Sequence, residues 1–283
     1  FSQWEGIKKT LKKEPLYLTQ KYEKGLLEFR SYFDPFKKGK LISFSDTRKL
    51  QRSITEKFKT FVKVLLEDAF LAMGPAPCGY DIRALGSISR EEICPFSDLE
   101  FMILLEKEDP GSKEYFFRLI QLLELQVRSF GETTDGLECV FTCLGDKNPS
   151  GFHLDAGGNP AKDDRLIGSP KKFGSLFSSL QDMAPNSVEN TILRSISLDT
   201  NNPKLFEQFQ EAVQNQLKDK LEKLSSQLIQ FRIEDFKANW KIPFDKSRET
   251  VNIKTDFIEL INHLMSDLAF RYGLNYQVTN VLD

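Results

Sequence analysis

Two acidic residues separated by a single position, Asp98 and Glu100, constrain the fold and chemistry of this chain more than any other feature. They open the apolar run 101–105, which is typical of a β-strand. Residues i and i+2 of a strand project from the same face, so two carboxylates can converge on one hard cation. Mg²⁺ suits such a pair because it keeps several waters and takes its remaining ligands from substrate phosphates. The pair therefore predicts a site for Mg²⁺, or Mn²⁺, that handles a nucleoside triphosphate.

A glycine–serine pair, Gly86 and Ser87, follows the short run 80–85, with ten residues between it and Asp98. Glycine allows the backbone to approach a ligand closely. Ser87 stands where a short helix over residues 88–92 can begin. The free N–H groups at a helix start favour anions. The order predicts a phosphate-binding turn followed by a metal-binding acidic pair.

The whole pattern is an apolar residue, Gly, Gly or Ser, about ten residues, then Asp, an apolar residue, and Asp or Glu. It resembles the signature of the polymerase-β-like nucleotidyltransferase superfamily. The intervening residues resemble the active-site segment of the uridylyltransferases that modify the nitrogen-regulatory signal protein, and of their glutamine-synthetase adenylyltransferase relatives. The matching residues are Gly86, Arg90, Glu92, Pro95, Ser97 and Asp98. That branch usually has Asp where this chain has Glu100, and the wider superfamily accepts Glu there.

The resemblance implies an α+β fold in which a small mixed sheet with helices forms a polymerase-β-like nucleotidyltransferase core. It also implies an activity, the transfer of a nucleoside monophosphate from ATP or UTP to a hydroxyl with release of pyrophosphate. The acceptor would be a protein, so the reaction would be AMPylation or UMPylation. Asp98 and Glu100 would hold the metal, and the nucleotide would contact Gly86, Ser87, Arg90 and Ser97.

A third carboxylate is normally wanted on a neighbouring strand, where it completes the metal site and helps to deprotonate the attacking hydroxyl. Asp155 is the favoured candidate because it ends a short apolar run just before Gly157 and Gly158. Glu138, inside the apolar run 137–144, is the other candidate. A plainer interpretation of Asp155 is an acid that closes a turn before two glycines.

The resemblance covers roughly residues 45–283, and the whole chain divides into three consecutive segments. Residues 1–44 are expected to form an N-terminal helical extension, 45–184 the nucleotidyltransferase domain, and 185–283 an all-α helical bundle similar to a substrate-binding domain. Within them, a long helix is expected to have Ser45 or Asp46 as its N-cap and to end near residue 73. Ser169 and Pro170 predict the cap and first residue of another helix. Further helices are expected over 113–130, 188–198, 202–240 with a break, and 254–272.

The composition limits the classes of binding partner that can be expected. The net charge of −2 gives no general reason to expect nucleic-acid binding. No apolar run reaches the roughly 20 residues that cross a bilayer, and no signal peptide is evident. Four cysteines without a CxxC pair and two histidines do not predict a zinc site, and reduced thiols favour a cytoplasmic location. Since the chain starts at Phe1, we expect it to be part of a longer chain with flanking domains.

Two other functions remain open at this point. In the first, the chain keeps the fold as a nucleotide-sensing or interaction module that has lost turnover, an alternative supported by Glu100 and the undecided third acid. In the second, it transfers nucleotides to RNA or to a small molecule, although mild acidity disfavours RNA.

Overall fold

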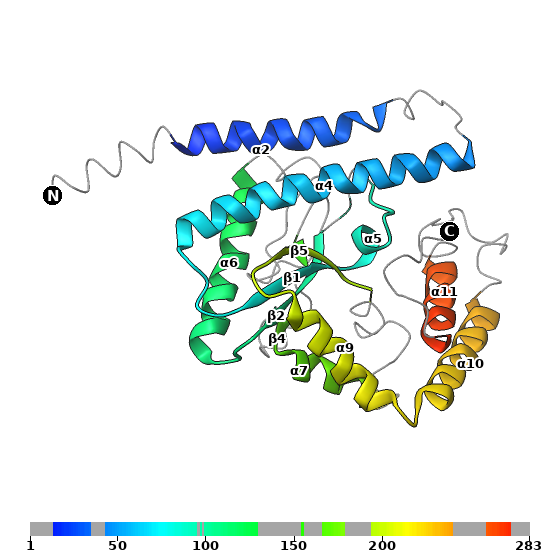
Figure 1. Ribbon diagram of the computed structural model, residues 1–283. Coiled ribbons are helices and arrows are strands. Elements are labelled where there is room, and N and C mark those ends of the chain that lie inside the picture. The colour runs from blue at the N-terminus through cyan, green and yellow to red at the C-terminus, as the bar shows by residue number, and fades with distance from the viewer. Residues whose placement is uncertain are drawn as a thin grey trace. The chain divides into compact units, whose positions relative to one another are not determined.

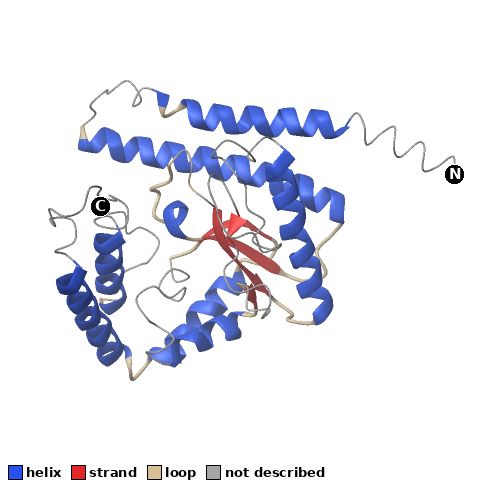
Figure 2. Ribbon diagram, turned by 180° about the vertical axis from the view of Figure 1, so that it is seen from behind, coloured by secondary structure: helices blue, strands red, loops and turns tan. Residues whose placement is uncertain are grey.

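The structure is a computed structural model that describes residues 14–34, 43–94, 97, 99–129, 154–155, 166–178, 194–239 and 259–272. The described chain is a mixed α+β protein in which helices predominate over one small sheet (Figure 1, Figure 2). This confirms the expected α+β class. No helix in these described ranges is both long enough and apolar enough to span a bilayer.

Five short strands form the sheet within the described residues: β1 (Tyr80–Ala84), β2 (Leu99–Leu105), β3 (Leu154–Asp155), β4 (Ile167–Gly168) and β5 (Ile196–Thr200). Their hydrogen-bonded order is β3-β2-β1-β5, and β4 also pairs with β2. The β2–β3 pair is parallel and the β1–β5 pair is antiparallel. Every β1 residue is buried, and so is every β2 residue except Glu100. Such burial explains why β2 reads as a nearly unbroken apolar run.

The chain forms two compact units that interleave along the sequence. The first comprises Phe1–Cys78, Glu91–Phe101 and Asp109–Ile167, and the second comprises Gly79–Arg90, Met102–Glu108 and Gly168–Asp283. Strand β2 begins in the first unit and ends in the second. This division cuts across the three consecutive segments expected from the sequence.

Three long helices build the first unit: α2 (Glu14–Ser31), α4 (Phe44–Met73) and α6 (Pro110–Ser129). Helix α4 contacts both α2 and α6, and its apolar stripe is buried as the spacing predicts, with Phe58 and Leu65 each 1% exposed. The expected cap of α4 is wrong. Ser43 is the N-cap of this helix, because its hydroxyl accepts a hydrogen bond from the Asp46 N–H at 3.2 Å. Asp46 lies within the first turn, where an acid favours the helix N-terminus.

The second unit contains α5 (Gly86–Ser89), α7 (Pro170–Ser175), the 3-10 turn η3 (Leu176–Ser178), α9 (Lys204–Leu217), α10 (Leu221–Asn239) and α11 (Glu259–Arg271). The predicted cap of α7 is confirmed, since the Ser169 hydroxyl accepts a bond from the Lys172 N–H at 3.2 Å. The break predicted within 202–240 separates α9 from α10. Helices α10 and α11 pack together, with a buried ion pair between Arg232 Nε and Asp267 Oδ2 at 3.2 Å.

One expected helix is wrong in its last residues. A helix was expected over 188–198, but Ile196–Thr200 forms β5 and pairs with β1. Ile196, Leu198 and Thr200 alternate with Ser197 and Asp199, the two-residue period of a strand. The segment 185–283, expected to be all-α, therefore contains a strand as well as helices.

Candidate functional site

The parallel pairing of β2 with β3 brings two candidate acids together. Leu99 is the partner of Leu154, and Glu100 is the partner of Asp155. Neighbouring strands lie about 4.8 Å apart, so Asp155 stands directly beside Glu100 although it is distant from it in the chain. Glu100 is half-buried, in contrast to its buried neighbours on β2.

The other predicted acids lie outside the described residues. These are Asp98, which directly precedes β2 in the chain, and Glu138, the alternative third carboxylate. Among the described residues, no group of three or more His, Cys, Asp or Glu side chains is placed to hold a metal ion. The described strand pair therefore brings the backbone positions of Glu100 and Asp155 side by side, and Asp98 stands two residues before Glu100 in the sequence.

Ser97 shapes the turn that leads into β2. Its hydroxyl accepts a hydrogen bond from the Cys94 N–H at 2.9 Å, and its own N–H donates to the Cys94 carbonyl at 3.1 Å. These two bonds close a short turn just before the strand. Ser97, predicted to contact the nucleotide, thus has a local structural role as well.

Gly86 and Ser87 lie in the second unit, at the point where β1 passes into α5. Gly86 has φ +57°, a left-handed conformation that glycine adopts without steric cost. The expected cap is wrong here too, because Leu85 rather than Ser87 precedes the helix and makes no side-chain capping bond. Helix α5 also ends at Ser89, earlier than expected, and Arg90 is its C-cap. Ser87 is half-buried and Gly86 is buried.

A buried ionic network that was not expected from the sequence anchors β1 just before this turn. Arg83 Nη1 donates to Asp81 Oδ2 at 2.7 Å, and the guanidinium also bonds the Ser195 hydroxyl and carbonyl, each at 2.8 Å. Its Cζ atom lies 3.5 Å from the centre of the Phe206 ring. Asp81 also accepts a bond from the Ser197 hydroxyl at 2.7 Å. The network joins β1 to β5 and α9 and so fixes the strand that leads to Gly86.

Burial controls the pKa values in this network. It raises the pKa of Asp81 above the usual range, although Arg83 and Ser197 partly oppose the change. It also lowers the pKa of the Arg83 guanidinium, which Asp81 partly restores. The spacing of Asp81 and Arg83, two apart on an expected strand, was a signal that could have revealed the pair.

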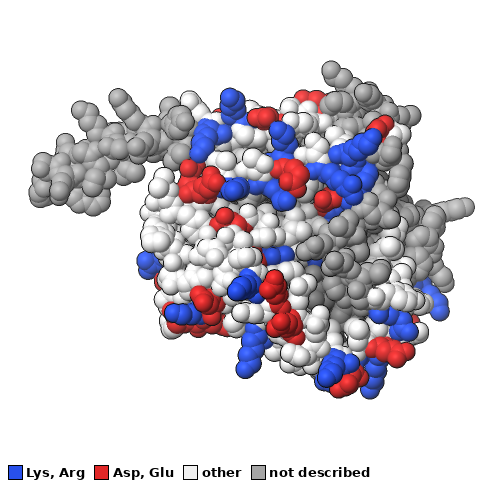
Figure 3. Space-filling view, in the orientation of Figure 1, with Lys and Arg blue, Asp and Glu red and all other residues white. Residues whose placement is uncertain are grey.

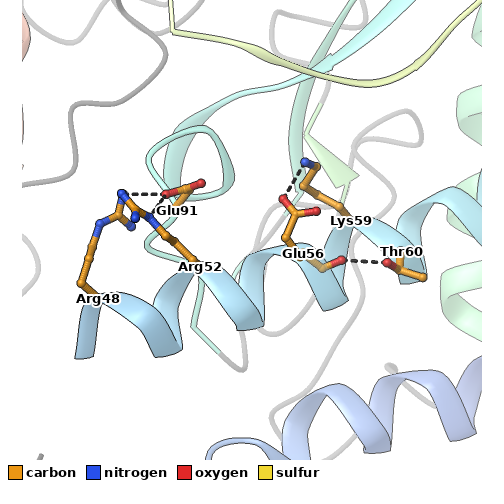
Figure 4. A network of polar contacts seen from close by, with 6 residues as sticks. All are labelled: Arg48, Arg52, Glu56, Lys59, Thr60 and Glu91. Atoms are coloured by element: carbon orange, nitrogen blue, oxygen red, sulfur yellow. Dashed lines mark hydrogen bonds and ion pairs between the residues drawn. The ribbon is translucent and has the colours of Figure 1, made fainter. Parts of the chain in front are cut away.

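A second contact that was missed at the sequence level holds the segment that follows α5. Glu91 accepts from Arg48 Nη2 at 2.6 Å and from Arg52 Nε at 3.4 Å, both on α4 (Figure 4). All three residues belong to the first unit, as Glu100 does. Glu91, just after α5, is therefore tied to α4, and the first two residues of β2, Leu99 and Glu100, are paired with β3.

Basic and acidic side chains are interspersed over the face drawn in Figure 3. Lys and Arg side chains gather on the upper part of that face, with Asp and Glu side chains between them. Its charge pattern is that of an ordinary solvated surface.

Neither a scan against protein-family models nor a search of curated proteins found a match. Function is therefore inferred from the residues and their geometry. Carboxylates on neighbouring strands suit the binding of a hard divalent cation and the acceptance of a proton.

Proposed function

We propose that this chain is a metal-dependent nucleotidyltransferase with a polymerase-β-like core, and that it transfers AMP or UMP to a hydroxyl group on a protein. The observation that carries the proposal is the pairing of Glu100 with Asp155 across parallel strands. A site of this class needs two carboxylates from one strand and a third from its neighbour. Glu100 and Asp155 are partners in the strand register, and Asp98, two residues before Glu100 in the chain, would supply the remaining carboxylate.

The residues present fit Mg²⁺ or Mn²⁺. All three are carboxylates, the oxygen ligands that such hard cations prefer, and a partial protein ligand set is sufficient because phosphates supply the remainder. Asp98 and Glu100 would hold the ion, with Asp155 as a further ligand. When bound, the ion would offset the triphosphate charge and lower the pKa of the acceptor hydroxyl.

The remaining residues have roles in binding and proton transfer. Asp155 accepts the proton of the acceptor hydroxyl, whose oxygen forms a bond to the α-phosphorus. The bond from that phosphorus to the oxygen shared with the β-phosphate breaks, and pyrophosphate leaves. Gly86 and Ser87 contact the departing phosphates, while Arg90 contributes positive charge. They follow β1, which neighbours β2 in the strand order. No covalent nucleophile on the enzyme is required.

The acceptor class follows from the resemblance to protein-modifying uridylyl- and adenylyltransferases. In this proposal the helices after β5 select the acceptor, and the nucleotide is ATP or UTP.

The test is transfer of label from each triphosphate to proteins of a lysate, with Mg²⁺ or Mn²⁺. Glu100→Gln and Asp155→Asn should each reduce labelling on the order of 100-fold or more, because each removes a negative charge at the reacting centre. Glu106→Gln is the matched control. Glu106 follows the other end of β2 and accepts from the Gly79 N–H at 3.0 Å, a bond that Gln can keep.

The outcomes separate the candidate functions. Label on a protein band that depends on Glu100 and Asp155 supports the proposal. Label on nucleic acid would instead support the alternative function, the transfer of nucleotides to RNA. Tight triphosphate binding without transfer under either metal would point to a nucleotide-sensing module instead.

A further inference from the structure

Glu91 has an uncommon backbone conformation. Its φ is +56°, and it is the only non-glycine residue with positive φ in the part of the chain that the structure describes. It directly follows Arg90, the C-cap of α5, at a position where glycine is usual. A side chain with Cβ is disfavoured there, so something else must hold the residue in place.

The carboxylate of Glu91 provides that restraint. Its Oε2 atom accepts from Arg48 Nη2 at 2.6 Å and from Arg52 Nε at 3.4 Å. The two arginines lie four residues apart and so share one face of α4 (Figure 4). The Arg48 side chain is 8% exposed and that of Arg52 is 54% exposed. Arg48 is the principal anchor, because the shorter contact is also the better shielded from water.

The restrained residue precedes Glu100 with only eight residues between them in the chain. Within that stretch, Ile93 is 3% exposed, and the reciprocal bonds of Cys94 and Ser97 close the turn into β2. Leu99 and Glu100 then pair with β3. Glu91 is thus linked in the chain to the start of β2 by a short stretch in which Ile93 is buried and Cys94 and Ser97 are hydrogen-bonded to each other.

We propose that Arg48 and Glu91 are a positioning pair that fixes the entry into β2 and so sets Glu100 against Asp155. The inference rests on the proposed function for the role of the two acids. Neither Arg48 nor Glu91 contacts substrate in this scheme. Both act through the backbone of the segment that they hold.

Two measurements test the pair: amide hydrogen exchange of residues 91–94, and Mn²⁺ affinity from the EPR signal of free Mn²⁺. Glu91→Gln, which keeps the shape of the side chain and removes its charge, should speed exchange in this segment about tenfold. It should also weaken Mn²⁺ binding by about tenfold, the lower end of what loss of a supporting partner costs a metal site. Glu91→Ala should behave similarly, because it keeps the Cβ that is disfavoured at this φ and lacks the carboxylate.

The matched control is Glu56→Gln. Glu56 bonds Lys59 Nζ at 2.8 Å on the same helix, in an ion pair that does not involve the segment before β2 (Figure 4). Neither exchange nor Mn²⁺ affinity should change. Arg48→Gln and the double variant Arg48→Gln/Glu91→Gln complete a cycle in which the second substitution adds little to the first. If buried Arg48 does not tolerate Gln, Glu91→Gln and Glu91→Ala still decide the question.

The outcomes distinguish this inference from the proposed function. If Mn²⁺ binding depends on Glu100 but is unchanged by Glu91→Gln, the positioning role of Arg48 and Glu91 is overturned and the proposed function is not. This holds even if amide exchange in residues 91–94 becomes faster. Wild-type behaviour of Glu91→Ala would overturn it as well, by showing that the carboxylate is dispensable. If the wild-type chain shows no Mn²⁺ binding that depends on Glu100, both proposals are overturned.

Discussion

Two arginine–carboxylate pairs of almost equal length have different places in this molecule. Arg83 and Asp81 lie two apart on β1, with 2.7 Å between Nη1 and Oδ2, and their side chains are 6% and 1% exposed. Arg48 and Glu91 come from a helix and a loop, with 2.6 Å between Nη2 and Oε2, and their side chains are 8% and 28% exposed. Of these four residues, Glu91 alone has a left-handed conformation.

The surroundings of each pair show what it can do. Besides Asp81, the Arg83 guanidinium bonds Ser195, just before β5, and lies over the ring of Phe206 on α9. Its charge is therefore compensated by residues of its own surroundings. Such a network stabilises strand pairing. The Arg48–Glu91 pair restrains a left-handed backbone position that precedes Glu100 in the chain with eight residues between them. Loss of the first should therefore appear mainly in stability, and loss of the second mainly in metal binding and transfer.

The largest effect on stability is expected for Asp81→Ala. Removing one partner of a buried ion pair leaves an uncompensated charge, which costs about 3–5 kcal/mol. Urea unfolding should show this loss in the transition midpoint. The double variant Asp81→Leu/Arg83→Met should recover much of it, and a single-variant cost below about 1 kcal/mol would contradict the assignment of this pair to stability.

Glu91→Gln should cost less, about 2 kcal/mol, because it weakens charge-assisted bonds at a side chain that water partly reaches. The same urea titration measures this. A loss equal to that of Asp81→Ala would remove the distinction between the two pairs.

Phe206→Leu tests one contact of the buried network. Arg83 keeps its hydrogen-bonding partners in this variant but loses the aromatic face, which is worth about 1 kcal/mol. Arg83→Lys, made with and without Phe206→Leu, is the comparison that isolates the ring contact. An unchanged unfolding midpoint in Phe206→Leu would show that the ring serves only as apolar cover.

The smallest effect is expected for Glu56→Gln. The Glu56 side chain is 66% exposed, and surface pairs on a helix contribute about 0.3 kcal/mol. The urea unfolding midpoint of Glu56→Gln should stay within error of the wild-type midpoint. The difference between the two should depend little on salt. A loss above about 1 kcal/mol would show that exposure does not rank these ion pairs.

Local patterns predicted much of the fold. The apolar run at β2, the stripe of α4, the Ser169 cap and the break between α9 and α10 follow from residues close together in sequence. Strand β5 was missed because five residues carry a weak period, and their pairing with β1 is decided by tertiary context. The caps of α4 and α5 were misplaced by a few residues, the usual uncertainty at helix ends.

The candidate site likewise contains residues that local patterns predicted and contacts that they did not. Asp98, Glu100, Gly86 and Ser87 stand out because their chemistry depends on short spacings. The register that sets Asp155 beside Glu100, and the contact of Arg48 with Glu91, each join residues that are far apart in sequence. Such contacts depend on how strands and helices pack, which no local pattern encodes.

The pairing of Glu100 with Asp155 at a metal can be observed by anomalous diffraction from crystals grown with Mn²⁺ and a non-hydrolysable triphosphate analogue. The account predicts a manganese peak about 2.1 Å from carboxylate oxygens of Glu100 and Asp155, with the triphosphate completing the coordination. A triphosphate bound elsewhere, or no manganese peak at these acids, would contradict it.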